Sequence, residues 1–196
     1  MSQTRQIERG VNPLFVERWS ARAFDESTLT EAELQTVFEA ARWAPSAYNA
    51  QPWRFLYARR GTPDWRKFLD FLIPYNRDWA QHASALIIAL SARRLVPPGK
   101  TEAIDSIYHS HDTGAAVGFL VLQAHLSGLN TRIIGGFDQE KVKSELGVPD
   151  DYAVESLIVI GRKGKPETLS ESFRAREAPS ERLPLQNLVA EGRFGF

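Results

Sequence analysis

The sequence predicts an α+β or α/β fold in which helices cover a central sheet. Stretches with apolar residues at helical spacing alternate with short apolar runs typical of strands, and one long, almost wholly apolar helix follows the most apolar of these runs. The length of 196 residues suits one domain with a substantial core. We therefore expect a single domain over residues 1–196.

The first helix is expected from Thr30 to about Ala44. Thr30 and Glu33 form a capping-box pattern, and apolar residues follow at helical spacing. Residues 46–52 are polar and predict a loop, and the apolar residues 55–58 predict a strand. The pattern then predicts, in order, a helix over 65–72, a short helix from Asn76 toward residue 83, and a central strand over 86–90.

A long helix is expected over about residues 105–127, ending at Gly128. It is apolar nearly all round, so it belongs in the middle of a core or in an interface. Its small residues, among them Gly114 and Gly118, would let another backbone approach closely. The remaining regular elements are expected to be a strand over 131–134, a helix that Asp138 caps and that ends at Gly147, and a strand over 154–161.

The last part of the chain, about residues 162–196, has a different character. It is polar, is interrupted by Pro166, Pro179 and Pro184, and lacks a regular period. It is therefore either disordered or an arm that lies on another surface. Two aromatic residues close to the end favour the arm.

Composition excludes several kinds of chemistry. The chain has no cysteine, which excludes disulfides, thiolate metal sites and a cysteine nucleophile, so redox chemistry would need a bound cofactor. Basic and acidic residues balance at 24 each, which argues against nucleic acid as a partner. The most apolar stretch, residues 83–92, is far shorter than the ~20 residues of a membrane helix. We expect a cytoplasmic protein with no membrane or nucleic-acid partner.

Two motifs that suggest chemistry carry little weight. Residues 98–101 imitate the end of a phosphate-binding loop, but Arg94 stands where that loop needs a glycine. His109 and His111 suggest a metal site, yet residues two apart on a helix point to different sides. One of the two histidines is more readily expected to line a ligand pocket, and no metal site is expected.

The most informative cluster is Arg18-Trp19-Ser20-Ala21-Arg22. Two arginines four residues apart with a serine between them suit a phosphate group, because guanidinium forks supply charge and paired donors while the hydroxyl adds a neutral donor. The cluster alone also fits an ordinary charged surface.

Together with later motifs, this cluster resembles the FMN-dependent nitroreductase family, which opens with an Arg-x-Ser-x-Arg/Lys segment. The matches follow the family's order over nearly the whole chain. They are Arg18 to Arg22, Ala44-Pro45-Ser46, Asn49-Ala50-Gln51-Pro52-Trp53, Asn76, Gly128-Leu129, Gly136-Phe137-Asp138 and Arg182-Leu183-Pro184.

The resemblance implies a nitroreductase-like α+β fold with a mostly antiparallel sheet covered by helices. It also implies an intertwined homodimer in which the C-terminal arms, about residues 162–196, exchange between subunits, with two FMN sites at the interface. Arg18 and Arg182 would hold the FMN phosphate, and Ser20 would bond the phosphate or the ribityl chain.

At the flavin ring, the resemblance places Arg22 near the N1/O2 edge, where a fixed cation favours reduction, and Asn76 at the N3/O2 edge. Gly135 and Gly136 would present backbone N–H groups to N5 and O4. Residues of the other subunit would close over the cofactor. The full expected cofactor-binding set is Arg18, Trp19, Ser20, Arg22, Pro45, Ser46, Ala47, Asn49, Asn76, Ile134, Gly135, Gly136 and Arg182.

Two positions depart from the family pattern. Gly135 stands where better-studied members carry an acidic residue, and Trp79 stands where some members carry a lysine. The backbone donor at Gly135 survives the change, whereas Trp79 leaves more of the charge to Arg22. Both departures bear on substrate preference rather than on flavin binding.

The function implied is an oxidoreductase in which hydride passes from NADH or NADPH through flavin N5 to a small electron-poor acceptor, such as a nitroaromatic, a quinone or an enone. No side chain needs to act as a catalytic nucleophile, because the flavin carries the chemistry. The alternatives are a desaturase, dehalogenase or flavin-fragmenting enzyme, a flavin-binding protein without turnover, and, more remotely, a hydrolase with a metal at His109 and His111.

Overall fold

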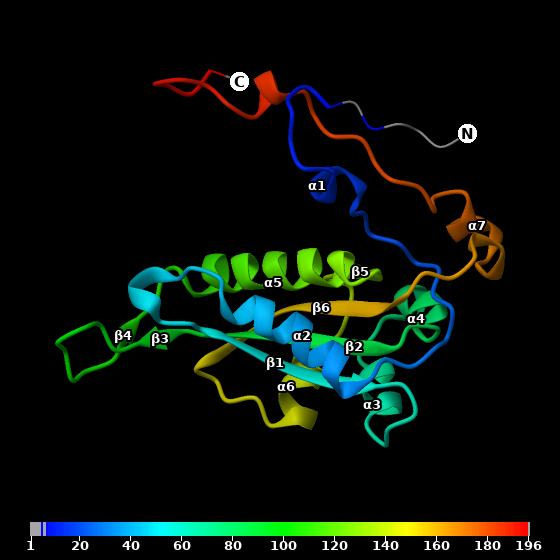
Figure 1. Ribbon diagram of the computed structural model, residues 1–196. Coiled ribbons are helices and arrows are strands. Elements are labelled where there is room, and N and C mark those ends of the chain that lie inside the picture. The colour runs from blue at the N-terminus through cyan, green and yellow to red at the C-terminus, as the bar shows by residue number, and fades with distance from the viewer. Residues whose placement is uncertain (1–4, 6, 196) are drawn as a thin grey trace.

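The computed structural model describes residue 5 and residues 7–195. Its core is a four-stranded sheet in the order β1-β2-β6-β5, and every pair in it is antiparallel (Figure 1). The N-terminal segment adds one parallel bridge at the β5 edge, between Ser20 and Thr131. The strands are β1 (Trp53–Arg59), β2 (Ala85–Ala92), β5 (Leu129–Ile134) and β6 (Tyr152–Arg162).

Helices cover both faces of this sheet (Figure 1). Alternate residues of β2 point to opposite faces, so Ile87 packs with α2 and α5 while Ile88 packs with α3, α4 and α6. The strand is buried almost throughout, as its continuous apolar run predicts. The helices are α2 (Glu31–Arg42), α3 (Trp65–Asp70), α4 (Pro74–Ala80), α5 (His109–Leu126) and α6 (Gln139–Leu146).

Local sequence signals fix the ends of two helices. At the start of α2, Thr30 Oγ1 accepts the Glu33 backbone N–H and the Glu33 carboxylate accepts the Thr30 N–H, which confirms the capping box. The Asp138 side chain caps α6 by accepting the backbone N–H of Lys141. Helix α6 ends at Gly147, whose φ of 63° is the left-handed conformation that glycine adopts most easily.

Helix α5 begins later than the sequence predicts. The expected start near Asp105 is wrong, because the short strands β3 (Arg94–Leu95) and β4 (Ile104–Asp105) pair as a hairpin and hold residues 104–105 in extended form. The helix buries Ala116, Leu120 and Ala124 against the sheet. An added Cβ at Gly114 or Gly118 would meet nothing within 4 Å, so the glycines lie on the open side of the helix.

The chain after β6 divides into a packed part and an extended part. Leu169 and Phe173, the latter on α7 (Glu171–Arg174), are buried in this chain's own core. The segment that leaves the core therefore begins near Ala178, well after the expected boundary near residue 162. The chain after β6 also includes two short 3-10 turns, Pro166–Thr168 (η2) before α7 and Leu185–Asn187 (η3) after it.

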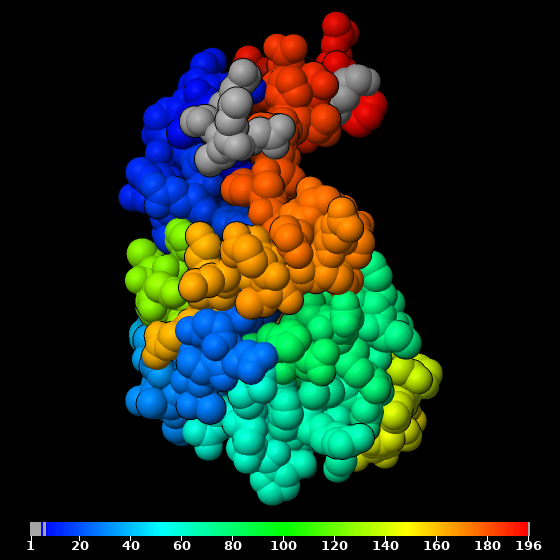
Figure 2. Space-filling view, turned by 90° about the vertical axis from the view of Figure 1, so that its right-hand side faces the viewer, coloured from blue at the N-terminus to red at the C-terminus, as the bar shows by residue number. Residues whose placement is uncertain are grey.

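The two terminal segments run together away from the body of the molecule (Figures 1 and 2). Arg5 Nε donates to the Ser180 carbonyl at 3.1 Å, and the Leu185 N–H donates to Glu8 Oε1 at 2.9 Å. Helix α1 (Pro13–Glu17) belongs to the N-terminal segment. Across residue 5 and residues 7–195, no helix is both long enough and apolar enough to cross a membrane.

Candidate cofactor site

Arginine side chains from both ends of the chain converge on one cavity of about 320 Å³. Three segments build it: the N-terminal segment between Arg5 and Arg22, strand β5, and the chain that follows α7. The cavity thus brings together five residues that the sequence predicts for one site. Its lining residues are Arg5, Arg18, Trp19, Ser20, Arg22, Arg132, Arg176, Ala178, Ser180 and Arg182.

Backbone contacts hold the N-terminal side of this cavity in place. Ser20 forms a bridge with Thr131 on β5, and the guanidinium group of Arg132 donates to the Ser20 carbonyl. On the other side, Glu177 Oε1 accepts the backbone N–H groups of Arg22 and Ala23, each at 2.8 Å. Hydrogen bonds therefore hold residues 18–22 both against the edge of the sheet and against the chain after α7.

Arg22 is a buried cation whose donors are not all used. The residue is 8% exposed, its Nη1 lies 3.8 Å from Glu177 Oε2, and its Nε has no hydrogen-bond partner within residue 5 and residues 7–195. A buried donor without a partner costs free energy, roughly 1–3 kcal/mol or more for a charged group. Arg22 also lines the cavity, so its guanidinium group lies beside any ligand that enters there.

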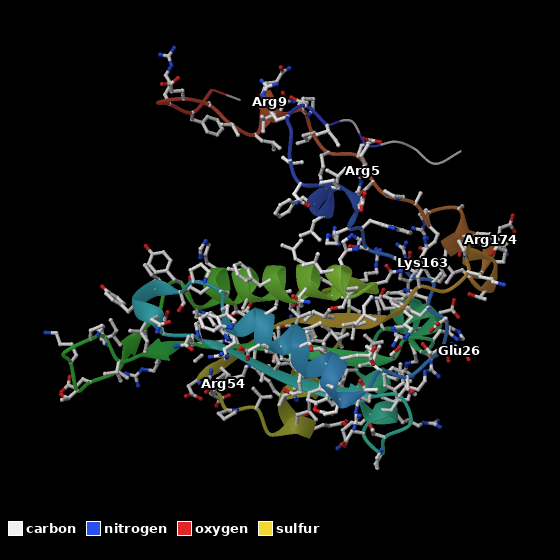
Figure 3. The ribbon with its side chains drawn as sticks, in the orientation of Figure 1. Arg5, Arg9, Glu26, Arg54, Lys163 and Arg174 are labelled. Carbon is white, nitrogen blue, oxygen red and sulfur yellow. The ribbon has the colours of Figure 1, made fainter. Side chains whose placement is uncertain are left out.

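The other end of the cavity is cationic and has no acidic lining residue. Burial lowers the pKa of Arg18 below its ordinary value, and the neighbouring Arg5 and Arg182 lower it further. Arg5 lies where the two terminal segments run side by side (Figure 3), and its Nη1 donates to the Arg18 carbonyl at 2.9 Å. Three mutually repelling guanidinium groups fit a dianionic phosphate, which relieves their repulsion and accepts their bonds.

Asn76 and Gly136 form a second part of the site. Asn76 is on α4 and only 8% exposed, and its Nδ2 donates to the Gly136 carbonyl at 2.9 Å. A Cβ at Gly136 would lie 2.6 Å from that Nδ2, whereas a Cβ at Gly135 would meet nothing within 4 Å. Ile134, at the end of β5, is buried beside this turn. Of these two glycines, Gly136 is the one at which an added Cβ would force neighbouring side chains to shift.

Trp79 links this second part to the arginine cavity. It lies one helical turn after Asn76, is buried in the core and stacks on Phe24 with ring centroids 6.4 Å apart. The guanidinium carbon of Arg132 lies 5.7 Å from the Trp79 ring centroid. Trp79 is therefore a core residue that supports Arg132, and it offers no exposed surface to a substrate.

The remaining expected residues lie in the loop that includes the 3-10 turn η1 (Ala47–Asn49), at the opposite end of α5. The Ala47 N–H donates to Asp112 Oδ2 near the start of that helix, at 2.8 Å. Strand β5, which lines the cavity, follows the other end of α5. The 18 residues of α5 span about 27 Å, so one chain does not bring this loop to the arginine cavity. The loop residues concerned are Pro45, Ser46, Ala47 and Asn49.

Comparison with known proteins decides the family. The family model of the nitroreductase family matches residues 16–70 and 72–162. The chain belongs to the nitroreductase family. The resemblance noted from the sequence is thereby confirmed, together with the nitroreductase-like α+β fold.

Individual nitroreductase relatives cover most of the chain. An oxygen-insensitive NADPH nitroreductase from Helicobacter acinonychis (strain Sheeba) is 30% identical over 184 residues, which cover 78% of this chain and 87% of the relative. An NADH dehydrogenase from Thermus thermophilus is 25% identical over 202 residues, covering 89% and 92%. A crystal structure of an oxidoreductase containing FMN has a TM-score of 0.95 and 40% identity, covering 100% of this chain and 98% of that chain.

His109 and His111 do not line the arginine cavity of this nitroreductase. His109 Nδ1 is 2.7 Å from Ser91 Oγ, which donates in turn to Glu155, and His111 Nδ1 is 3.0 Å from Asp112 Oδ1. In the described part of the chain, no three potential metal-ligating side chains lie close enough to hold an ion. The structure gives the alternative of a metal-dependent hydrolase no support.

Four charged residues of the site were not predicted from the sequence, and neither were the lining residues Ala178 and Ser180. Arg5, Arg132 and Arg176 line the cavity, and Glu177 bonds the backbone of Arg22. One signal for Arg132 was present in the sequence, because it is the single charged residue of the strand Leu-Asn-Thr-Arg-Ile-Ile. The other three depend on contacts between segments more than 150 positions apart in the sequence.

Proposed function

We propose that this chain binds FMN in the arginine cavity and uses it to transfer hydride from NADH or NADPH to a small electron-poor acceptor. The observation that carries this proposal is the convergence of Arg18, Ser20, Arg22 and Arg182 on one cavity, with a buried Arg22 donor lacking a partner. The names of the nitroreductase relatives and the similar FMN-containing structure support it.

The phosphate of FMN fits the end of the cavity formed by Arg5, Arg18 and Arg182. These side chains supply three positive charges against the nearly two negative charges of a phosphate monoester. Ser20 adds a neutral donor on the same lining. We assign the phosphate to these residues because no acidic side chain lines the cavity, and the carboxylate of Glu181 acts on Arg5 from outside the lining.

The isoalloxazine ring fits the other end. We assign Arg22, which lines the cavity, to the N1/O2 edge. Asn76, whose Nδ2 already donates to Gly136, is assigned to the N3/O2 edge through its side-chain oxygen and its second N–H. Gly135 and Gly136 bring backbone to the same region, next to the end of β5. When bound, FMN supplies the two-electron chemistry that the protein side chains lack. The protein binds and orients it.

We propose that the working unit is a homodimer. Phe119 and Leu126 expose apolar surface on α5, and Gly114 and Gly118 leave room for another backbone. An antiparallel pairing of two α5 helices would bring the loop at one end of a helix to the arginine cavity at the other end. Each FMN site would then be completed by the loop of the other subunit, through the partner's Pro45, the partner's Ser46, the partner's Ala47 and the partner's Asn49.

The proposal is tested by anaerobic reduction of the purified, FMN-saturated protein. NADH or NADPH should bleach the flavin absorbance, and a nitroaromatic, a quinone or an enone should restore it through several cycles. A protein that holds flavin but is not bleached by either nucleotide would be a flavin-binding protein without turnover. A protein that takes up no FMN at all would overturn the assignment of the cavity.

A further inference from the structure

Arg132 lines the arginine cavity beside Trp79, and the charge that acts on it is that of Arg22 rather than that of Arg18. Its guanidinium group bonds the Ser20 carbonyl and lies over the ring of Trp79, one turn along α4 from Asn76. Burial lowers the pKa of Arg132, and the charge of Arg22 lowers it further. At the phosphate end the charges that act on Arg18 are those of Arg5 and Arg182 instead. The cavity thus has two separate groups of cations.

The ring end holds more positive charge than its carboxylate neutralises. Glu177 is the acidic group there, and its Oε1 is already occupied by the N–H groups of Arg22 and Ala23. Its Oε2 has no hydrogen-bond partner in the described residues and lies 3.8 Å from Arg22 Nη1. Glu177 thus acts on Arg22 through an ion pair and on Arg132 only at longer range. Arg176, whose guanidinium carbon lies 5.8 Å from the Tyr75 ring centroid, adds a third cation further out.

Surplus positive charge in a partly buried place is costly unless a ligand uses it. The oxidised flavin ring is neutral, whereas uptake of two electrons and one proton leaves one negative charge on it. A fixed cation beside the ring therefore stabilises the reduced form more than the oxidised form. Such a preference raises the reduction potential.

We propose that Arg132 acts with Arg22 as a second fixed cation that raises the reduction potential of the bound FMN. This inference rests on the proposed function, because it requires FMN in the cavity. Arg132 sets the affinity difference between the two redox forms of the cofactor, while Arg18 and Arg182 set the affinity for both forms equally through the phosphate.

The test is an equilibrium redox titration of the FMN-saturated protein and its variants. Arg132→Gln should lower the preference for reduced over oxidised FMN about tenfold, which for a two-electron couple is a fall of about 30 mV. Arg132→Lys keeps the charge and should retain most of the wild-type potential. Arg18→Gln is the matched control, since it should weaken binding of both redox forms and leave the potential unchanged.

Glu177→Gln tests the same idea with the opposite sign. The amide oxygen of glutamine still accepts the N–H groups of Arg22 and Ala23, while the negative charge is removed, so the potential should rise. An unchanged potential in Arg132→Gln, or an equal fall in Arg132→Lys and Arg132→Gln, would overturn the inference. If Arg132→Gln does not fold, Arg132→Lys and Glu177→Gln still test the charge argument, and a potential of Glu177→Gln that stays constant or falls rejects it. Wild-type protein without FMN would instead reject the proposed function.

Discussion

The side-chain amide of Asn76 donates a hydrogen bond of 2.9 Å to the carbonyl oxygen of Gly136. This bond ties α4 to the turn that follows β5, two elements that lie 60 residues apart in the sequence. It also fixes the plane of the Asn76 amide, so that the side-chain oxygen has a defined direction. A site that must read one edge of a planar ring requires such a fixed direction.

Gly136→Ala should disturb this bond. The new Cβ would lie 2.6 Å from Asn76 Nδ2 and 3.0 Å from Ile73 Cδ1, so side chains must shift, at a cost of roughly 1–3 kcal/mol. Thermal unfolding and FMN titration should show a lower melting temperature and weaker binding. Gly135→Ala, where the space is open, is the matched control and should change neither quantity appreciably. Equal effects of the two substitutions would contradict the steric argument.

Arg18→Ala and Arg182→Ala should each weaken FMN retention. A lost hydrogen bond from a charged group costs about 1.5–3 kcal/mol, which is roughly a tenfold to hundredfold rise in the FMN dissociation constant. Riboflavin, which lacks the phosphate, should bind wild type and both variants with similar affinity. Arg54→Ala serves as a control for general loss of an arginine, since the Arg54 guanidinium donates to the backbone carbonyls of Gln51 and Trp53, away from the cavity lining. Wild-type FMN occupancy in Arg18→Ala would reject the phosphate assignment.

Truncation after Ala178 should weaken the proposed dimer while leaving the core intact. It removes the extended segment but keeps Leu169 and Phe173, which are buried in this chain's own core. Sedimentation should show at least a tenfold rise in the dimer dissociation constant, about 1.4 kcal/mol.

Two further variants separate the causes of that effect. Truncation after Gly164 also removes Leu169 and Phe173 and should unfold the chain. Leu183→Asp, on the apolar surface between the terminal segments, should weaken the dimer without removing Arg182. A dimer that survives truncation after Ala178 unchanged would show that this segment does not hold the subunits together.

Stability in acid should depend on Glu33. Hydrogen bonds from the backbone and side chain of Thr30, helped by Arg162, hold the pKa of Glu33 below its ordinary value of 4.5. A carboxylate with a lowered pKa in the folded state stabilises the fold above about pH 4.5 and loses that contribution as the pH falls toward the lowered pKa. Urea unfolding between pH 6 and pH 3 should therefore show a shallower pH dependence for Glu33→Gln than for wild type. Glu102→Gln, in an exposed loop, should follow the wild-type curve.

Local sequence signals predicted the elements whose causes are local. The capping box at Thr30 and Glu33, and the glycine that ends α6, depend on residues within a few positions of one another. The start of α5 was predicted too early because residues 104–105 take part in a hairpin with residues 94–95, and pairing across a loop overrides helical periodicity.

The residues of the candidate site could be predicted only where they stand together in a short sequence motif. Arg18, Ser20 and Arg22 stand in one short segment, so the pattern of residue types was visible in the sequence. Arg132 enters the site because the Ser20 segment lies beside β5 in one particular register, and Arg5 enters because the two terminal segments lie together. Such registers follow from tertiary packing rather than from local propensity.

The loop that includes η1, which packs against the start of α5, has a strained backbone. Tyr48, Asn49 and Gln51 have φ angles of 54°, 54° and 47°, a region that costs an L-residue about 1–2 kcal/mol, with asparagine the best tolerated. Glycine at Tyr48 would release that energy and raise thermal stability, yet it would also give the loop new conformations to visit. A search for a more heat-resistant form of this protein would therefore select changes in this loop. The same loop is proposed to complete the FMN site of the neighbouring subunit, which requires its fixed shape. Thermostability and cofactor retention should be scored together in any such search.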